Sequence, residues 1–211
     1  ETREKVYTIT LGLRPSALAF DQQSGQLWVT NQGDNTVQVI DRLAGAASAP
    51  IKVGTLPRAL AFAGGHVWVA NFSDNTVQAL DPIAGSAAAS IRVGVAPRGM
   101  VFDNAHQRLW LTLGSDNTVV EVDPETGQLG QPIPVEAGPR DIAFDGQLLW
   151  VANITSNTVQ AINPETRAIV HTVTVGQTPR AILYAAGRVW VANQLSDNVM
   201  AIDPVTGQIE E

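Results

Sequence analysis

Four arginines are the residues of this chain whose type and spacing suggest chemistry. Each directly follows a proline, and the four recur at steps of 40, 42 and 40 residues: Arg58, Arg98, Arg140 and Arg180. A guanidinium is always charged at neutral pH and pairs in a bidentate way with carboxylates and phosphates. Arginines that meet at one place repel one another unless anions lie between them. The pattern therefore predicts either a binding site for an anion or a repeated ion pair with aspartates of the same or neighbouring repeats.

Asp141 is the one residue that breaks the pattern around the arginines. It follows Arg140, whereas the equivalent positions of the other repeats carry Ala17, Ala59, Gly99 and Ala181. An aspartate at this place has two interpretations: an acid that acts in the site, or the internal partner of a neighbouring arginine. We include it with the arginines as a candidate binding residue.

Other reactive side chains do not form a recognisable constellation. The three histidines, His66, His106 and His171, fall in two turns and an outer strand, so no zinc site and no Ser/His/Asp arrangement is expected. A glycosidase needs a pair of carboxylates, and only Asp141 is placed to serve. The Asp-Asn pairs, such as Asp34-Asn35, could hold calcium, but side-chain capping of the turn backbone is their more ordinary role. We expect no catalytic residue, no metal and no cofactor.

The arginines belong to a repeat of about 40 residues. The five tryptophans recur at steps of 40, 42, 40 and 40 residues, each in a Leu/Val-Trp-Val/Leu-Ala/Thr tetrad. They are Trp28, Trp68, Trp110, Trp150 and Trp190. Prolines keep the same step before the arginines, and in the first repeat Arg14 precedes Pro15 while Ser16 takes the arginine position. The chain is one unit written five times.

Each unit contains four segments with the composition of strands. In the second unit they are residues 59–62, 67–70, 77–80 and 90–93, which are short, rich in Val, Ile, Leu and aromatic residues, and bounded by turn formers. Turns such as Asp123-Pro-Glu-Thr-Gly127 place Pro and Gly where a tight hairpin needs them. No window shows an apolar stripe at helical spacing. The sequence predicts a four-stranded antiparallel meander in each unit.

Radial packing of such meanders gives an all-β fold, the β-propeller, here with five blades. The WD40 class is excluded because no unit has its Gly-His or Trp-Asp dipeptide. The units resemble the YVTN-repeat family of β-propellers: Leu27-Trp-Val-Thr-Asn31 differs from the naming motif only by Trp for Tyr, and the Asp-Pro-x-Thr-Gly turns match its second half. This resemblance implies a scaffold of surface proteins, sensors and a few enzymes, mostly with seven blades. It favours an extracellular, periplasmic or cell-surface location.

The two ends of the sequence complement each other. Residues 6–11 have the character of a fourth strand, and the last unit ends with the turn after Asp203, where its own fourth strand should begin. We therefore predict a ring closed by the N-terminal strand, which removes an exposed sheet edge and gives a monomer. The alternative is a fragment of a larger ring.

Composition fits one domain over residues 1–211. The chain has no Cys, no apolar stretch long enough for a membrane helix, and a net charge of −7, from 13 basic and 20 acidic residues. This charge argues against a nucleic-acid binder that neutralises phosphates, and no membrane insertion is expected.

In a propeller of this kind the four arginines are expected at the mouth of the central channel. The pattern favours a binding or protein-interaction module whose anion site at this channel mouth takes a small anionic ligand or an acidic side chain of a partner protein. Two alternatives stay open: an enzyme, such as a lyase or hydrolase that uses the channel mouth, and a structural or sensor domain of a larger surface protein.

Overall fold

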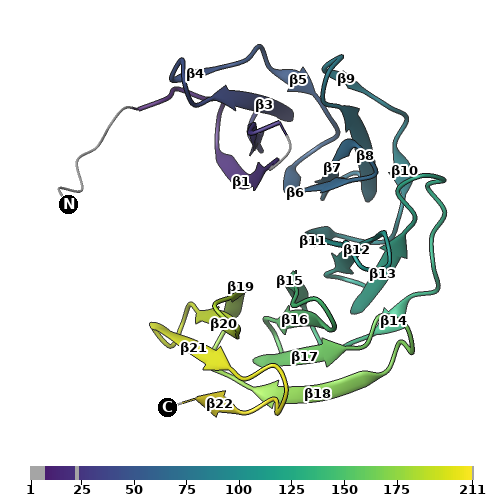
Figure 1. The fold of residues 1–211 in the computed structure, drawn as a ribbon, viewed down its shortest axis with the longest axis vertical. Coiled ribbons are helices and arrows are strands. Elements are labelled where there is room, and N and C mark those ends of the chain that lie inside the picture. Colours follow the sequence, from purple (N-terminus) through teal and green to yellow (C-terminus); the bar gives the residue numbers. More distant parts are fainter. Residues whose placement is uncertain (1–7, 22–23, 211) are drawn as a thin grey trace. The chain divides into compact units, whose positions relative to one another are not determined.

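The structure is a computed structural model that describes residues 8–21 and 24–210. The chain divides into two compact units, Glu1–Arg92 and Val93–Glu211. The described residues form five antiparallel sheets and no helix, so none of their segments is a helix that could cross a membrane. Sheets 1 and 2 lie in the first unit, and sheets 3, 4 and 5 lie in the second (Figure 1). That residues 1–211 form a single domain stays a prediction.

Each sheet is a meander whose first four strands pair in succession, and the fifth strand of sheets 1 and 2 pairs with the third. Sheet 1 contains β1 (Pro15–Phe20), β2 (Leu27–Asn31), β3 (Thr36–Asp41), β4 (Ala46–Ala47) and β5 (Ile51–Lys52). Sheet 2 contains β6 (Pro57–Ala63), β7 (His66–Asn71), β8 (Thr76–Asp81), β9 (Ser86–Ala87) and β10 (Ile91–Arg92).

The sheets of the second unit have four strands each. Sheet 3 contains β11 (Pro97–Asp103), β12 (Arg108–Leu113), β13 (Thr118–Val122) and β14 (Ile133–Pro134). Sheet 4 contains β15 (Pro139–Phe144), β16 (Leu149–Asn153), β17 (Thr158–Ile162) and β18 (Ile169–Thr174). Sheet 5 contains β19 (Pro179–Ala185), β20 (Arg188–Asn193), β21 (Asn198–Ile202) and β22 (Ile209–Glu210).

The fourth strand is the variable part of the meander. It runs unbroken through β18, but in sheet 1 it is split into β4 and β5, which both pair with β3. Pro50 lies in the gap and has no N–H to give to the ladder, which accounts for the break in this sheet. Sheet 2 has the same break without a proline, and nothing in its sequence explains it.

Consecutive sheets within a unit pack face to face through apolar side chains. Trp150 and Val159 of sheet 4 share a core with Ile182 and Val191 of sheet 5. Equivalent cores join sheet 3 to sheet 4 and sheet 1 to sheet 2. We call the tryptophan-bearing side of each sheet its trailing face and the other side its leading face. Each core thus joins a trailing face to the leading face of the next sheet.

Four of the five tryptophans are buried in the core: Trp28, Trp68, Trp110 and Trp150. Trp190 differs, because it is 39% exposed on the trailing face of sheet 5. In the described residues of the second unit, no further sheet covers that face.

The Asp-Pro-x-Thr-Gly segments are tight turns, as predicted. Asp123 accepts hydrogen bonds from the backbone N–H groups of Glu125 and Thr126, and these bonds lower the pKa of its carboxyl. Gly127 closes the turn with a φ of 72°, which a residue with a Cβ rarely adopts.

The predicted N-terminal strand, residues 6–11, begins outside the described residues, and its described part, residues 8–11, forms no strand. Sheet 5 also has a fourth strand of its own, because β22 pairs with β21 through Ile202 and Ile209. The expectation that the last unit ends before its fourth strand is therefore wrong, because Ile209 and Glu210 form the beginning of that strand. Ring closure stays a prediction.

Candidate functional site

The arginines lie where the first strand of each sheet begins. In sheet 4, Pro139 faces Asn153, and the register then shifts so that Asp141 faces Ala152, which leaves Arg140 at a β-bulge. The bulge recurs at Arg58, Arg98 and Arg180. It sets each arginine beside the end of the second strand, at what we call the proline end of the sheet, which also carries the turn between the second and third strands.

Three of the four arginines lie over the residue that follows the second strand of their own sheet. The guanidinium of Arg58 is 4.2 Å from the ring centroid of Phe72, in a cation–π contact. Arg98 crosses Gly114 so closely that a Cβ there would collide with it. Arg180 donates from Nη1 to Oε1 of Gln194. The position opposite the arginine therefore varies in chemistry from sheet to sheet.

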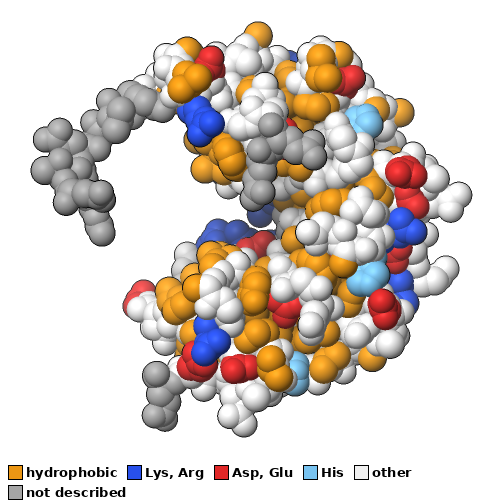
Figure 2. Space-filling view, in the orientation of Figure 1, with side chains coloured by type: hydrophobic (Ala, Val, Ile, Leu, Met, Phe, Trp, Pro, Cys, Tyr) orange, Lys and Arg blue, Asp and Glu red, His pale blue; other side chains and the backbone are white. Residues whose placement is uncertain are grey.

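Three arginines of the second unit are coupled. Strands β11, β15 and β19 lie side by side, and Nε of Arg140 donates to the backbone oxygen of Arg180 at 3.2 Å. Burial lowers the pKa of Arg98 below its ordinary value, and the positive charge of Arg180 lowers it further. Figure 2 shows basic side chains with an acidic one beside them on the inner side of this unit. The structure thus brings Arg98, Arg140 and Arg180 together; Arg58 belongs to the first unit.

Asp141 links sheets 4 and 5. One carboxylate oxygen accepts the N–H of Ile182 in β19 at 2.9 Å, and the other accepts the N–H of Ile142 at 3.0 Å. Burial raises the pKa of Asp141, while these two bonds and the charge of Arg140 act to lower it. Both carboxylate oxygens thus accept backbone N–H groups at the sheet junction. The pairing of Asp141 with a neighbouring arginine stays a prediction.

Other junctions use a hydroxyl for the same purpose. Thr112 accepts the N–H of Gly99 at 2.8 Å and donates to the backbone oxygen of Arg140 in the next sheet at 3.1 Å. In sheet 1, Ser16 donates to the backbone oxygen of Pro57 in sheet 2. Sheet 4 has Ala152 at the position of Thr112, and Asp141 supplies its junction instead. The replacement of a threonine by an alanine on one strand is thus matched by an aspartate on the neighbouring strand. The sequence analysis did not connect these two positions.

The aspartates at the proline end cap backbone. Asp34, Asp74 and Asp116 accept the N–H of Leu13, Thr55 and Val95 at 2.5–2.6 Å, each in the loop before the first strand of the same sheet. Ser156 and Ser196 do the same in sheets 4 and 5. The aspartates of the Asp-Asn turns thus cap backbone, but it is the backbone of the loop before the first strand and not that of their own turn, as the sequence had suggested.

The asparagines of three such turns reach the next sheet. Oδ1 of Asn35, Asn117 and Asn157 accepts an N–H from the residue before the next sheet's proline, at 2.8–2.9 Å. The donors are Leu56, Gly138 and Thr178. All three asparagines have a φ between 53° and 58°, a left-handed conformation that asparagine tolerates better than most residues.

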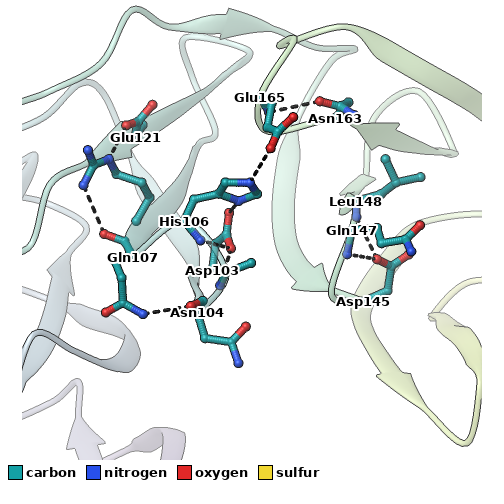
Figure 3. Close-up of polar contacts among 12 residues, drawn as sticks. Asp103, Asn104, His106, Gln107, Glu121, Asp145, Gln147, Leu148, Asn163 and Glu165 are labelled. Atoms are coloured by element: carbon teal, nitrogen blue, oxygen red, sulfur yellow. Dashed lines mark hydrogen bonds and ion pairs between the residues drawn. The ribbon is translucent and has the colours of Figure 1, made fainter.

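His106 forms a second polar cluster at the opposite end of the second unit. Its Nδ1 lies 2.6 Å from the fully buried carboxylate of Asp103, and its Nε2 lies 3.0 Å from Glu165 of sheet 4 (Figure 3). The hydrogen bond to Asp103 has the largest effect on the pKa of His106 and raises it, and the hydrogen bond to Glu165 raises it further. Among the described residues, no group of three metal-binding side chains converges. Sequence reasoning placed His106 in a turn away from the arginines, which is correct, but missed the two carboxylates.

Comparisons with known proteins identify the fold. The family model described as Lactonase, 7-bladed beta-propeller matches residues 66–211. No curated protein matches the sequence. Among solved structures, catalytically inactive virginiamycin B lyase from Staphylococcus aureus with quinupristin is 17% identical, with 93% of this chain and 68% of that chain covered and a TM-score of 0.81.

Two further structures are similar at comparable identity. Hydrazine synthase from Kuenenia stuttgartiensis is 17% identical, with 99% of this chain and 68% of that chain covered and a TM-score of 0.85. A streptogramin B lyase is 16% identical, with coverages of 94% and 68% and a TM-score of 0.80. At these identities the likeness shows the fold alone. The predicted class, an all-β propeller with five blades of four antiparallel strands, is confirmed.

Proposed function

Since the chain belongs to the Lactonase, 7-bladed beta-propeller family, we propose that it is a propeller binding module in which Arg98, Arg140 and Arg180 take an anionic group. The group is a carboxylate or a phosphate, carried by a small ligand or by a partner protein. The finer classification as a YVTN-repeat protein is a proposal too, supported by Leu27-Trp-Val-Thr-Asn31 and its repeats.

The observation that carries the proposal is the electrostatic state of Arg98. Its pKa is lowered by burial and by the charge of Arg180, so its surroundings disfavour the cation. An anion between these side chains would offset both effects, because charges interact more strongly where water is partly excluded. Of the nearby carboxylates, Asp116 and Asp141 accept backbone N–H groups, and the charge of Arg140 also acts on Asp141.

The alternative function is an enzyme at the same place. Its support is Asp141, a carboxyl with a pKa raised by burial beside a group of arginines, since perturbed pKa values concentrate at functional sites. Similar structures named lyases agree with it at the level of fold. The structural bonds of Asp141 to Ile142 and Ile182 favour the binding module.

The test is a thermal-shift series with sulfate, phosphate and citrate at constant ionic strength. A ligand at ten times its Kd stabilises by about 1.4 kcal/mol, which raises Tm by roughly 3–6 °C for a chain of this size. The parent is compared with Arg98→Gln/Arg180→Gln, and Arg92→Gln, an exposed arginine of the first unit, is the control. The proposal expects the shift in the parent and the control and its loss in the double variant; equal shifts in all three contradict it.

A further inference from the structure

A groove opens between sheets 1 and 2 of the first unit. It lies beside β4, β5 and β9, at the edge of these sheets opposite β1 and β6 (Figure 1). Its volume of about 790 Å³ is that of a small-molecule site. Most of its walls are small apolar side chains, among them Ala46, Ala47 and Ala49 of sheet 1 and Pro82, Ala84 and Ala87 of sheet 2.

The equivalent place between sheets 3 and 4 is filled by Arg167. The guanidinium of this arginine lies 5.6 Å from the ring of Trp110 and donates to Glu121 and to the backbone oxygen of Gln131. Between sheets 1 and 2 the same turn position holds Gly85. Gly85 and Arg167 share a φ of 62°, and a Cβ on Gly85 would meet no atom closer than 3.7 Å. The two turns therefore have the same conformation at this residue, and only one of them carries a side chain there.

Between sheets 4 and 5 the place is filled from the other side. The ring of His171 in β18 stacks on Trp150, with 6.0 Å between the ring centroids and 14° between the planes. It approaches Gly207, the equivalent of Gly85, so closely that a Cβ there would collide with it. The position of His171 holds Ala49 in sheet 1. Both junctions of the second unit thus have one large side chain over the tryptophan, whereas the junction of sheets 1 and 2 has Gly85 and Ala49.

Other substitutions make the groove larger and remove its charge. Ala47 and Ala87 stand where sheets 3 and 4 have Leu129 and Ile169. Val39 takes the position of the glutamate that pairs with the arginine between sheets 3 and 4. Apolar volume is therefore missing from both walls, and neither member of that ion pair remains for a ligand to balance.

Among the described residues, two charged side chains line the groove, and both are already engaged. Asp41 accepts the N–H groups of Ala44 and Leu43, and these bonds lower the pKa of its carboxyl. Nζ of Lys52 donates to the backbone oxygen of Asp34 at 3.3 Å. The two charges lie at opposite ends of β3, because Asp41 is its last residue and Lys52 pairs with its first. The walls between them suit an uncharged ligand, since a charge placed there would lose water without gaining a partner.

We propose that the groove between sheets 1 and 2 binds a neutral, apolar small molecule, which takes the space that Arg167 and His171 fill at the other junctions. Trp28 is fully buried, and Val39 and Ile51 pack against the core that contains it. The ligand therefore rests on aliphatic side chains and not on the indole ring. This site belongs to the first unit and is independent of the anion site proposed for the second.

The experiment is a titration of the full chain with cyclohexanol, followed by NMR of its alanine methyl groups. The proposal expects saturable shifts at Ala47, Ala49 and Ala87, and none at Ala143 or Ala161, which are buried in the core of sheets 4 and 5. Cyclohexylamine and cyclohexanecarboxylate, which are charged at neutral pH, should bind more weakly than cyclohexanol. Shifts that stay linear with concentration, or tighter binding of a charged probe, overturn the proposal.

Two variants fill the groove from opposite sides. Gly85→Arg copies the arginine of sheet 4, and Ala49→His copies the histidine of sheet 4, so each should abolish the saturable shifts. The matched control is Gly65→Arg, the same change at an exposed turn glycine that also has a positive φ, of 73°, and open space around its Cβ. It should bind like the parent. Binding that persists unchanged in the folded variants at positions 85 and 49 places the probe elsewhere and contradicts the proposal.

Discussion

The two ends of the second unit use arginine in opposite ways. At the end opposite the prolines, Arg108 contacts Glu121 at 2.8 Å and Asp123 at 3.1 Å, and Arg167 contacts Glu121 at 2.9 Å. Arg188 pairs with Glu210, and this hydrogen bond raises its pKa. At the proline end, the pKa of Arg98 is lowered instead. At one end the arginines form ion pairs with carboxylates. At the proline end the arginines lie close together, and the aspartates accept hydrogen bonds from backbone N–H groups.

A repeated charged residue can therefore serve either the structure or a binding site. Periodicity alone does not distinguish a structural arginine from a binding one, because both recur with the fold. The distinguishing feature is where the neighbouring carboxylates are engaged. At the proline end, Asp116 and Asp141 hold backbone N–H groups.

The largest expected effect comes from the tryptophan below the ion pairs. Trp110 is 1% exposed, and the guanidinium of Arg167 lies 5.6 Å from its ring. Trp110→Ala should lower the free energy of unfolding by ~3–5 kcal/mol, because it removes core volume and the platform of Arg167 together. Denaturant unfolding checks this, with Trp190→Ala, which is 39% exposed, as the matched variant that should cost clearly less.

The second effect separates the two uses of carboxylates. Asp141→Ala leaves the N–H groups of Ile142 and Ile182 without this acceptor and should cost about 1–3 kcal/mol. Glu125→Ala, an exposed carboxylate in a turn, should stay within about 0.5 kcal/mol of the parent. Urea midpoints of both variants measure the difference. A variant at position 141 as stable as the parent would show that the link between sheets 4 and 5 does not depend on this side chain.

A third and smaller effect concerns the arginines themselves. Arg108→Gln should lower stability by about 0.5–1 kcal/mol, because the pairs with Glu121 and Asp123 are partly exposed. Arg98→Gln should cost less than Arg108→Gln in a buffer without multivalent anions, because burial and the charge of Arg180 already disfavour the charge of Arg98. Thermal unfolding in such a buffer compares them. Equal losses in the two variants would remove the contrast between the two ends.

The smallest effect is a pH dependence at the end opposite the prolines. The pKa of His106 is raised above its ordinary value, so the stability that protonated His106 contributes is fully present below about pH 6.5 and is lost as pH rises through the raised pKa. Tm of the parent minus Tm of His106→Gln should therefore fall as pH rises through that range. A difference that stays flat with pH would show that His106 does not stay protonated between Asp103 and Glu165.

Much of the fold follows from the sequence, because the tryptophans and prolines keep one step and each turn carries its own chemistry. The grouping of Arg98, Arg140 and Arg180 follows too, since a repeated position in stacked sheets returns to the same end. The partners of the aspartates cannot be predicted from the sequence, because a backbone N–H competes with an arginine for a carboxylate. Nearly every residue has such an N–H, so the residue types do not show which one the carboxylate accepts. The split of β4 and β5 is readable at Pro50, but the same split in sheet 2 is not.

The turn between the second and third strands has a consequence for how such a chain evolves. One of its residues binds the loop of its own sheet, and the next, an asparagine, binds the loop of the sheet that follows. Each joint is therefore specified by a dipeptide and a stretch of backbone. A repeat duplicated or deleted as a whole would make the same joint with its new neighbour and need no compensating mutation. This gives a physical route by which members of a propeller family can come to differ in their number of repeats.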